Sequence, residues 1–157
     1  MIVVQQQAFD VGQEYARLKA ARTDIGATAM FVGSVRDISE GLAVSTMTLE
    51  HYPGMTERSL EDIELEARKN WPISDCLIIH RYGTLQLGED IVLVITCAAH
   101  REAAFEACQF LMDWLKTKAP FWKLEEGGGG TRWVEAKASD NHAAEKWKLN
   151  LGKIKVD

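Results

Sequence analysis

A chain of 157 residues is long enough to bury a substantial hydrophobic core, and we expect a single domain over residues 1–157 with a polar tail from about residue 149. Hydrophobic residues make up 46% of the chain and charged residues 26%, which is typical of ordered globular proteins and argues against disorder. The formal net charge of −5 argues against nucleic-acid binding, which would need a local basic patch.

The first elements alternate between strand-like and helix-like patterns. The opening MIVVQQQAFD has one short apolar run without a basic region before it, which fits neither a signal peptide nor a membrane span, so we expect a cytoplasmic protein with no membrane partner. Asp10 is a candidate N-cap of a helix that ends near Arg22. Residues 27–35 predict a strand, and the turn residues RDISEG lead to a second strand around residues 44–52, so we expect a hairpin.

The middle of the chain predicts one helix and two buried strands. The PGM sequence interrupts the preceding strand, and residues 56–70 then place Leu60, Ile63 and Ala67 at helical spacing. Two short β-branched runs, CLIIH at 76–80 and IVLVITCAA at 91–99, predict buried strands. The sequence YGTLQLGED between them is typical of a turn region.

The longest predicted helix runs from Arg101 to about Lys118, because apolar residues recur there at steps of one, three and four. Pro120 ends it and disfavours helical backbone in the residue before it. The elements expected after the proline are a strand at 121–125, a connection at 127–130 (GGGG), a partner strand at 131–137 and a short helix around 141–148.

Three lysines surround the proline in the sequence LKTKAPFWK, residues 115–123, and Lys118 falls on a different side of the helix from Lys116. Lys116 borders the buried stripe of its helix, and Lys123 shares one side of the following strand with Phe121. A chain that turns at Pro120 would bring both ammonium groups toward one cavity. The alternative is that both are ordinary solvated lysines.

Three further basic residues lie at the ends of predicted strands. His100 and Arg101 fall where a strand gives way to the long helix, and free backbone N–H groups at such a junction favour an anion. Arg36 follows the GSV stretch, and arginine binds phosphate in a bidentate manner. The alternatives are a surface histidine–arginine pair and an ion pair of Arg36 with Asp37 or Glu40.

Several well-known site patterns are missing from the sequence. The chain has no GxSxG, Walker, dinucleotide-binding or HExxH motif. Its three cysteines lack CxxC spacing and its four histidines are dispersed, so we expect no disulfide framework, no metal and no cofactor. The residues alone therefore predict an anion-receptive basic cavity on an acidic α+β protein.

Four segments of the sequence point to a particular protein family. TLEHYPGMTE, IHRYGTLQLGED, AHREAAFEACQFLMDWLKTKAPFWK and RWVEA, which occur in this order over nearly the whole chain, closely resemble the large, catalytic subunit of molybdopterin synthase. The resemblance implies an α/β hammerhead fold with an additional small antiparallel β subdomain. It also implies a homodimer at the centre of a heterotetramer, with a ubiquitin-like small subunit bound at each end.

In that family the small subunit is a sulfur carrier whose C-terminal Gly-Gly thiocarboxylate enters a pocket of the large subunit. Sulfur passes to cyclic pyranopterin monophosphate, and two transfers form the dithiolene of molybdopterin. The resemblance makes Lys116 and Lys123 the catalytic residues. The residues that it implies for substrate binding are Ser34, Val35, Arg36, His100, Arg101, Leu124 and Glu125.

Ser34 departs from the family pattern, because a basic residue often stands beside the arginine. Two alternatives to catalysis remain at this stage. One is an adaptor that binds a ubiquitin-like sulfur carrier without turnover. The other is a single-strand nucleic-acid binder that uses tryptophans and lysines, for which binding would depend steeply on salt.

Overall fold

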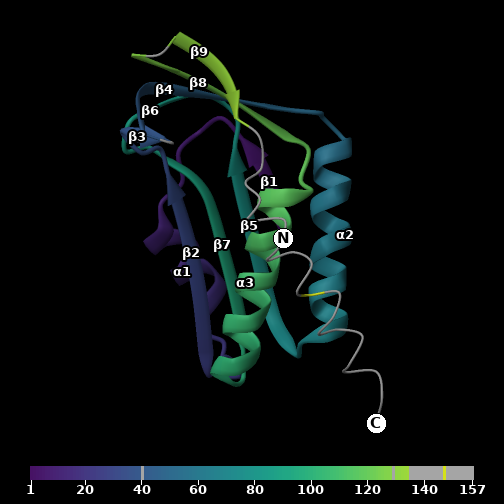
Figure 1. Cartoon of the computed structure of the whole chain (residues 1–157). Helices are drawn as coiled ribbons and strands as arrows, with labels where there is room; N and C mark the ends of the chain where they lie inside the picture. Colours follow the sequence, from purple (N-terminus) through teal and green to yellow (C-terminus); the bar gives the residue numbers. More distant parts are fainter. Residues whose placement is uncertain (40, 129, 135–146, 148–157) are drawn as a thin grey trace.

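A computed structural model describes residues 1–39, 41–128, 130–134 and 147 of the chain (Figure 1). Its three helices are α1 (Val11–Lys19), α2 (Met55–Asn70) and α3 (Arg101–Thr117). Its strands are β1 (Ile2–Gln5), β2 (Ala27–Ser34), β3 (Ile38–Ser39), β4 (Leu42–His51), β5 (Ile73–Arg81), β6 (Gly83–Gln86), β7 (Asp90–Ala98), β8 (Phe121–Gly127) and β9 (Gly130–Val134). The mixture confirms the predicted α+β class. No helix in these ranges is long and apolar enough to cross a membrane.

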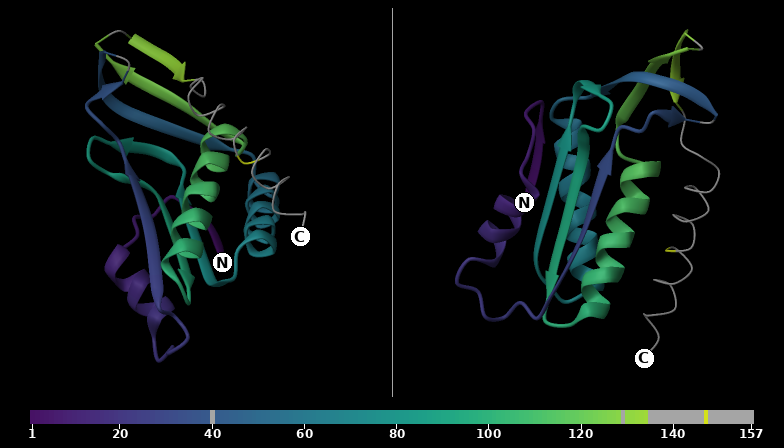
Figure 2. Two further views of the ribbon diagram at one scale, coloured as in Figure 1. Left: turned by 60° about the horizontal axis from the view of Figure 1, so that its bottom comes forward. Right: turned by 90° about the vertical axis from the view of Figure 1, so that its left-hand side faces the viewer.

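The first sheet has the strand order β1-β5-β7-β2 and is covered on both faces. α2 and α3 lie on one face and α1 on the other (Figure 2). Side chains alternate along β7, so that Val92 and Val94 pack toward α2 and α3, whereas Leu93 and Ile95 pack toward α1. Burial on both faces explains why β5 and β7 are almost continuously apolar in sequence, as we predicted.

The second sheet joins β3, β4, β8 and β9 in that order, and β6 also pairs with β4. All of its pairings are antiparallel, and it lies across one end of the first sheet (Figure 1). Its core is small and consists of Val35, Met47, Leu49 and Leu85. The predicted hairpin after Pro120 is confirmed, since β8 pairs with β9 from Lys123–Val134 to Gly127–Gly130.

The hairpin predicted between residues 27–35 and 44–52 is wrong. β2 pairs with β7 in the first sheet, while β4 pairs with β3, β6 and β8 in the second. The chain changes sheets around Val35, whose side chain is buried in the core of the second sheet. The long apolar strand β7 offers β2 more buried contact than β4 could, so the tertiary pairing overrides the local turn signal.

Other differences concern short elements. The strand β1 was not predicted, and β6 lies in the stretch that we read as a turn. α1 ends at Lys19, before the predicted end near Arg22, although Asp10 does cap it by accepting a hydrogen bond from the Gln13 N–H at 2.8 Å. The predicted strand beyond residue 134 and the predicted helix around 141–148 lie outside the described residues, apart from Trp147.

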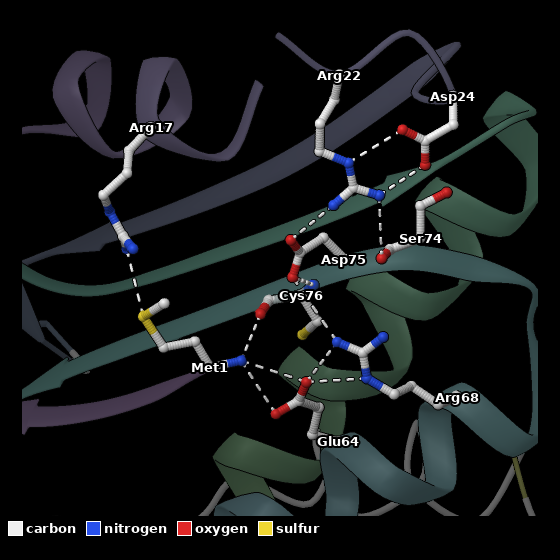
Figure 3. A network of polar contacts seen from close by, with 9 residues as sticks. All are labelled: Met1, Arg17, Arg22, Asp24, Glu64, Arg68, Ser74, Asp75 and Cys76. Carbon is white, nitrogen blue, oxygen red and sulfur yellow. Dashed lines mark hydrogen bonds and ion pairs between the residues drawn. The ribbon is translucent and has the colours of Figure 1, made fainter. Parts of the chain in front are cut away.

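A polar network ties the edge of the first sheet to α2 and to the segment after α1 (Figure 3). Arg22 contacts Asp75 at 2.9 Å and Asp24 at 2.6 Å, and Arg68 contacts Glu64 at 2.7 Å. The Arg22 guanidinium lowers the pKa of the Asp24 carboxyl to about 2 through its hydrogen bonds. Each of these groups already has a protein partner, so we assign the network a structural role.

Candidate functional site

The two predicted catalytic lysines lie where α3 meets the second sheet. Lys116 is in the last turn of α3 and is exposed, and residues 118–120 connect this helix to β8. Pro120 prevents continuation of the helix, and the chain turns directly into the strand that carries half-buried Lys123. Figure 1 shows the end of α3 next to the second sheet and its start far from it.

Phe121, the first residue of β8, belongs to a cluster of four rings. The His80 ring lies flat on the Phe121 ring, with centroids 3.6 Å apart and an interplanar angle of 14°. His51, at the end of β4, has its ring 6.3 Å from that of Phe121 and 4.4 Å from that of Tyr82. Phe121 and Lys123 leave β8 on the same side, so Lys123 extends toward these rings.

His80 is held neutral in this cluster. Burial lowers the pKa of its imidazole to about 3, and the charge of the nearby Lys123 acts in the same direction. Neither His80 nor His51 was predicted as a site residue. A histidine in an apolar strand gives no signal of its neighbours, because they come from another sheet.

Arg36 lies at the same end of the molecule as the lysines. It follows β2, whose last residue, Ser34, is paired with Asp90 at the start of β7, and α3 runs back toward this end along the sheet. The Arg36 side chain is exposed, whereas Val35 is buried and its N–H donates to the Glu89 carbonyl at 2.9 Å. The hydroxyl of Ser34 donates to the Asp90 carboxylate at 2.7 Å.

His100 and Arg101 lie at the opposite end of α3. His100 is the N-cap residue and Arg101 the first helical residue, and both side chains are exposed. The 15 or 16 residues between them and Lys116 correspond to about 22–24 Å at a rise of 1.5 Å per residue. One chain therefore does not bring all five basic residues together.

Leu124 and Glu125 lie on opposite sides of β8. Glu125 is buried, and its carboxylate pairs with Arg132 of β9 at 2.8 Å. The Arg132 guanidinium also donates to the Ser39 carbonyl at 2.9 Å. This ion pair was missed, although the hairpin register could have revealed it, since Glu125 and Arg132 stand directly opposite each other.

A shallow hollow lies on the second sheet beside this ion pair, and the lysines do not line it. Its lining residues are Leu42, Ala43, Val44, Glu125, Glu126, Gly127, Gly130 and Arg132. A Cβ atom on Gly127 would collide with the Ala43 carbonyl oxygen, so only glycine allows β8 to approach β4 this closely. At least one glycine of the GGGG sequence therefore has a packing role.

The three thiols are buried in the core. Burial raises the pKa of Cys76 to about 12 and that of Cys108 to about 11, and it also raises the pKa of Cys97. Such thiols are poor nucleophiles at neutral pH. Within the described part of the chain, no group of three or more histidine, cysteine or acidic residues is arranged to hold a metal ion.

Comparisons with known proteins identify the family. The model of the family described as MoaE protein matches residues 4–118. The molybdopterin synthase catalytic subunit of Pseudomonas aeruginosa is 54% identical over 147 residues, which cover 94% of this chain and 98% of that protein. The structure of the molybdopterin biosynthesis MoaE protein from Burkholderia ambifaria superimposes with a TM-score of 0.80 at 49% identity, over 94% of this chain and 97% of the other.

The fold recurs in a more distant structure, a complex of subunits 1 and 2 of the molybdopterin-converting factor from Helicobacter pylori. The TM-score is 0.69 at 20% identity, over 87% of this chain and 90% of the matched chain. The fold thus persists after most of the sequence has changed. On the strength of the family model and the close relatives, the chain belongs to the MoaE protein family of molybdopterin synthase catalytic subunits.

Proposed function

We propose that this chain transfers sulfur from the thiocarboxylated C-terminus of a ubiquitin-like small subunit to cyclic pyranopterin monophosphate. As a family member it is an enzyme, the catalytic subunit of molybdopterin synthase, and it acts in molybdenum cofactor biosynthesis. The observation that carries the proposal is the location of Lys116, Lys123 and Arg36 at one end of the molecule, where two sheets and a helix end meet.

The charges at this end suit the substrates. A thiocarboxylate and a phosphorylated pterin are both anions, whereas the chain as a whole carries a formal charge of −5. A local group of lysine and arginine side chains would attract both anions and stabilise negative charge that develops on sulfur or oxygen. In this proposal Lys116 polarises the thiocarboxylate or transfers protons there. Lys123 acts on the pterin as an acid or base, or through its charge.

The protein's own thiols have no part in this transfer. All three are buried, and their raised pKa values disfavour the thiolate that nucleophilic attack would require. The sulfur arrives on the partner's tail instead. Ser34, Val35, Leu124 and Glu125 would form part of the wall of the tail's path, because the Ser34 hydroxyl and the Glu125 carboxylate are already bound to Asp90 and Arg132.

His100 and Arg101 fit the proposal only if a second copy of the chain supplies them. They lie about 22–24 Å from Lys116 along α3, so they do not reach the lysines of their own protomer. We propose a central homodimer in which these two residues contribute to the partner protomer's site. A small subunit bound at each end completes a heterotetramer.

Reconstitution tests the function directly. Purified protein is mixed with cyclic pyranopterin monophosphate and either the thiocarboxylated or the plain carboxylate form of the small subunit, and molybdopterin is quantified after oxidation to a fluorescent derivative. We expect product only with the thiocarboxylate. If the chain binds the small subunit but forms no product with either form, it is an adaptor and the proposal is wrong.

Two expectations from the sequence stay predictions. A cytoplasmic location would be tested by fractionation of cells that express the protein at its natural level. A single domain over residues 1–157 would unfold in one cooperative transition when followed by both fluorescence and circular dichroism.

A further inference from the structure

His80 occupies a fixed position where the two sheets meet. It comes from the end of β5 in the first sheet, and its ring stacks on Phe121 at the start of β8 in the second. The side chain is only 6% exposed. A stacked aromatic pair of this kind restricts the ring to one orientation, and the direction in which its two nitrogens point is therefore set by the fold.

The hydrogen bond of His80 determines which nitrogen carries the proton. Nδ1 lies 2.9 Å from the main-chain carbonyl oxygen of Arg81. A carbonyl oxygen only accepts, so Nδ1 must be the donor. Because burial also keeps the imidazole neutral, with a pKa of about 3, Nε2 holds a lone pair and acts as an acceptor.

The cation that extends toward this ring is Lys123. It leaves β8 on the same side as Phe121, and its charge contributes to the lowered pKa of His80. His51 of β4 acts in the same direction. The Arg81 guanidinium is directed elsewhere, toward Glu89 at 3.1 Å and the Asp90 carbonyl at 2.9 Å.

We propose that His80 is a positioning residue for Lys123, in which Nε2 accepts a hydrogen bond from the ammonium group through one bridging water. The inference rests on the proposed function for the identity of the substrates. A lysine side chain is long and flexible, so an acceptor at a fixed place limits the positions of its charge. A neutral acceptor does this without adding a negative charge of its own beside the ammonium group.

The test measures Lys123 itself without any sulfur transfer. Each variant is acylated briefly with acetic anhydride over a range of pH, and the pKa of each lysine is obtained from the modified fraction by mass spectrometry. In His80→Phe, which keeps an aromatic ring but loses both nitrogens, we expect the pKa of Lys123 to fall by about one unit, since a hydrogen bond to the charged form is lost. Lys118, which is exposed, is the internal reference and should not move.

Two further variants sharpen the result. His80→Gln retains an acceptor oxygen, and the pKa of Lys123 should stay within about 0.3 unit of the wild-type value. If His80→Phe does not fold, His80→Leu takes its place as the variant without an acceptor. His51→Phe is the matched control from the same ring cluster, and it should leave the pKa of Lys123 unchanged.

An unchanged Lys123 pKa in a folded His80→Phe protein would overturn the proposal, and so would an equal shift in His51→Phe. The sulfur-transfer assay adds an independent readout, because the pH–rate limb that depends on Lys123 should shift with the labelling pKa. Full activity of a Lys123→Ala protein would instead contradict the proposed function, and the labelling result would still decide the role of His80.

Discussion

The two ends of α3 carry similar basic residues in different surroundings. At its C-terminal end, Lys116 and Lys123 lie where the helix, the turn at Pro120 and the second sheet meet, next to a cluster of rings in which His80 is buried and the others are half-buried. At its N-terminal end, His100 and Arg101 are exposed just beyond the end of the inner strand β7. One chain therefore brings Lys116 and Lys123 together at the first end, whereas in the proposed function His100 and Arg101 contribute only to the site of a second protomer.

Removal of either lysine is expected to have the largest effect. Lys116→Ala or Lys123→Ala should lower the rate of molybdopterin formation by about 10²–10³, the cost of losing one group that stabilises developing charge. The exposed Lys118 is the matched control, and Lys118→Ala should stay within about twofold of wild type. Single-turnover kinetics measures the rates, and calorimetric titration with the small subunit shows whether binding is retained. A loss of binding equal to the loss of rate would contradict a catalytic role.

Mixing defective protomers would test the other end of the helix. If each site combines Lys116 of one protomer with Arg101 of its partner, a mixed dimer of Lys116→Ala and Arg101→Ala has one intact site. Random exchange of subunits should therefore restore about a quarter of the wild-type rate from two nearly inactive proteins. The rate is measured before and after the proteins are unfolded and refolded together. No recovery, with mixed dimers confirmed by native mass spectrometry, would show that the two ends act within one chain or not at all.

The ring cluster at the lysine end predicts an acid-sensitive stability. The pKa of His80 is about 3 in the folded chain and 6.5 in the unfolded chain, so the unfolded state binds an additional proton between these values. The contribution of neutral His80 to the free energy of unfolding is complete above pH 6.5 and is lost as the pH falls toward 3. At pH 4.5 the free energy of unfolding should be lower by about 2–3 kcal/mol than at pH 7 on this account. Urea denaturation of wild type and His80→Phe at both pH values measures it, and a fall of the same size in the variant would exclude His80 as the cause.

Loss of the N-cap of α1, which is far from both ends of α3, should have the smallest effect. Asp10→Ala removes the side-chain cap of α1 and should lower the free energy of unfolding by about 1 kcal/mol. Asp10→Asn, which retains a capping oxygen, should cost only a few tenths of this amount. The rate of sulfur transfer should not change in either variant, because α1 lies on the opposite face of the first sheet from α3. A rate loss in Asp10→Ala would indicate that the two faces are coupled.

Much of the fold could be predicted because several elements are specified locally. β5 and β7 are apolar throughout, α2 and α3 have helical spacing, and Pro120 separates α3 from β8. The pairing of β2 could not be predicted, because its turn residues fit a hairpin while its actual partner, β7, lies more than 50 residues further along the chain. The short strands β1 and β6 exist only through their neighbours β5 and β4.

The sequence by itself determined which residues carry positive charge around Pro120, where the long helix ends, and the family to which the chain belongs. Only the tertiary structure decided which of these charges are neighbours. It placed Arg36 at the lysine end and His100 and Arg101 at the other, and it surrounded the start of β8 with rings from two sheets. The physical reason is that helix spacing and strand alternation are local, whereas the neighbours of a side chain depend on how separate elements pack.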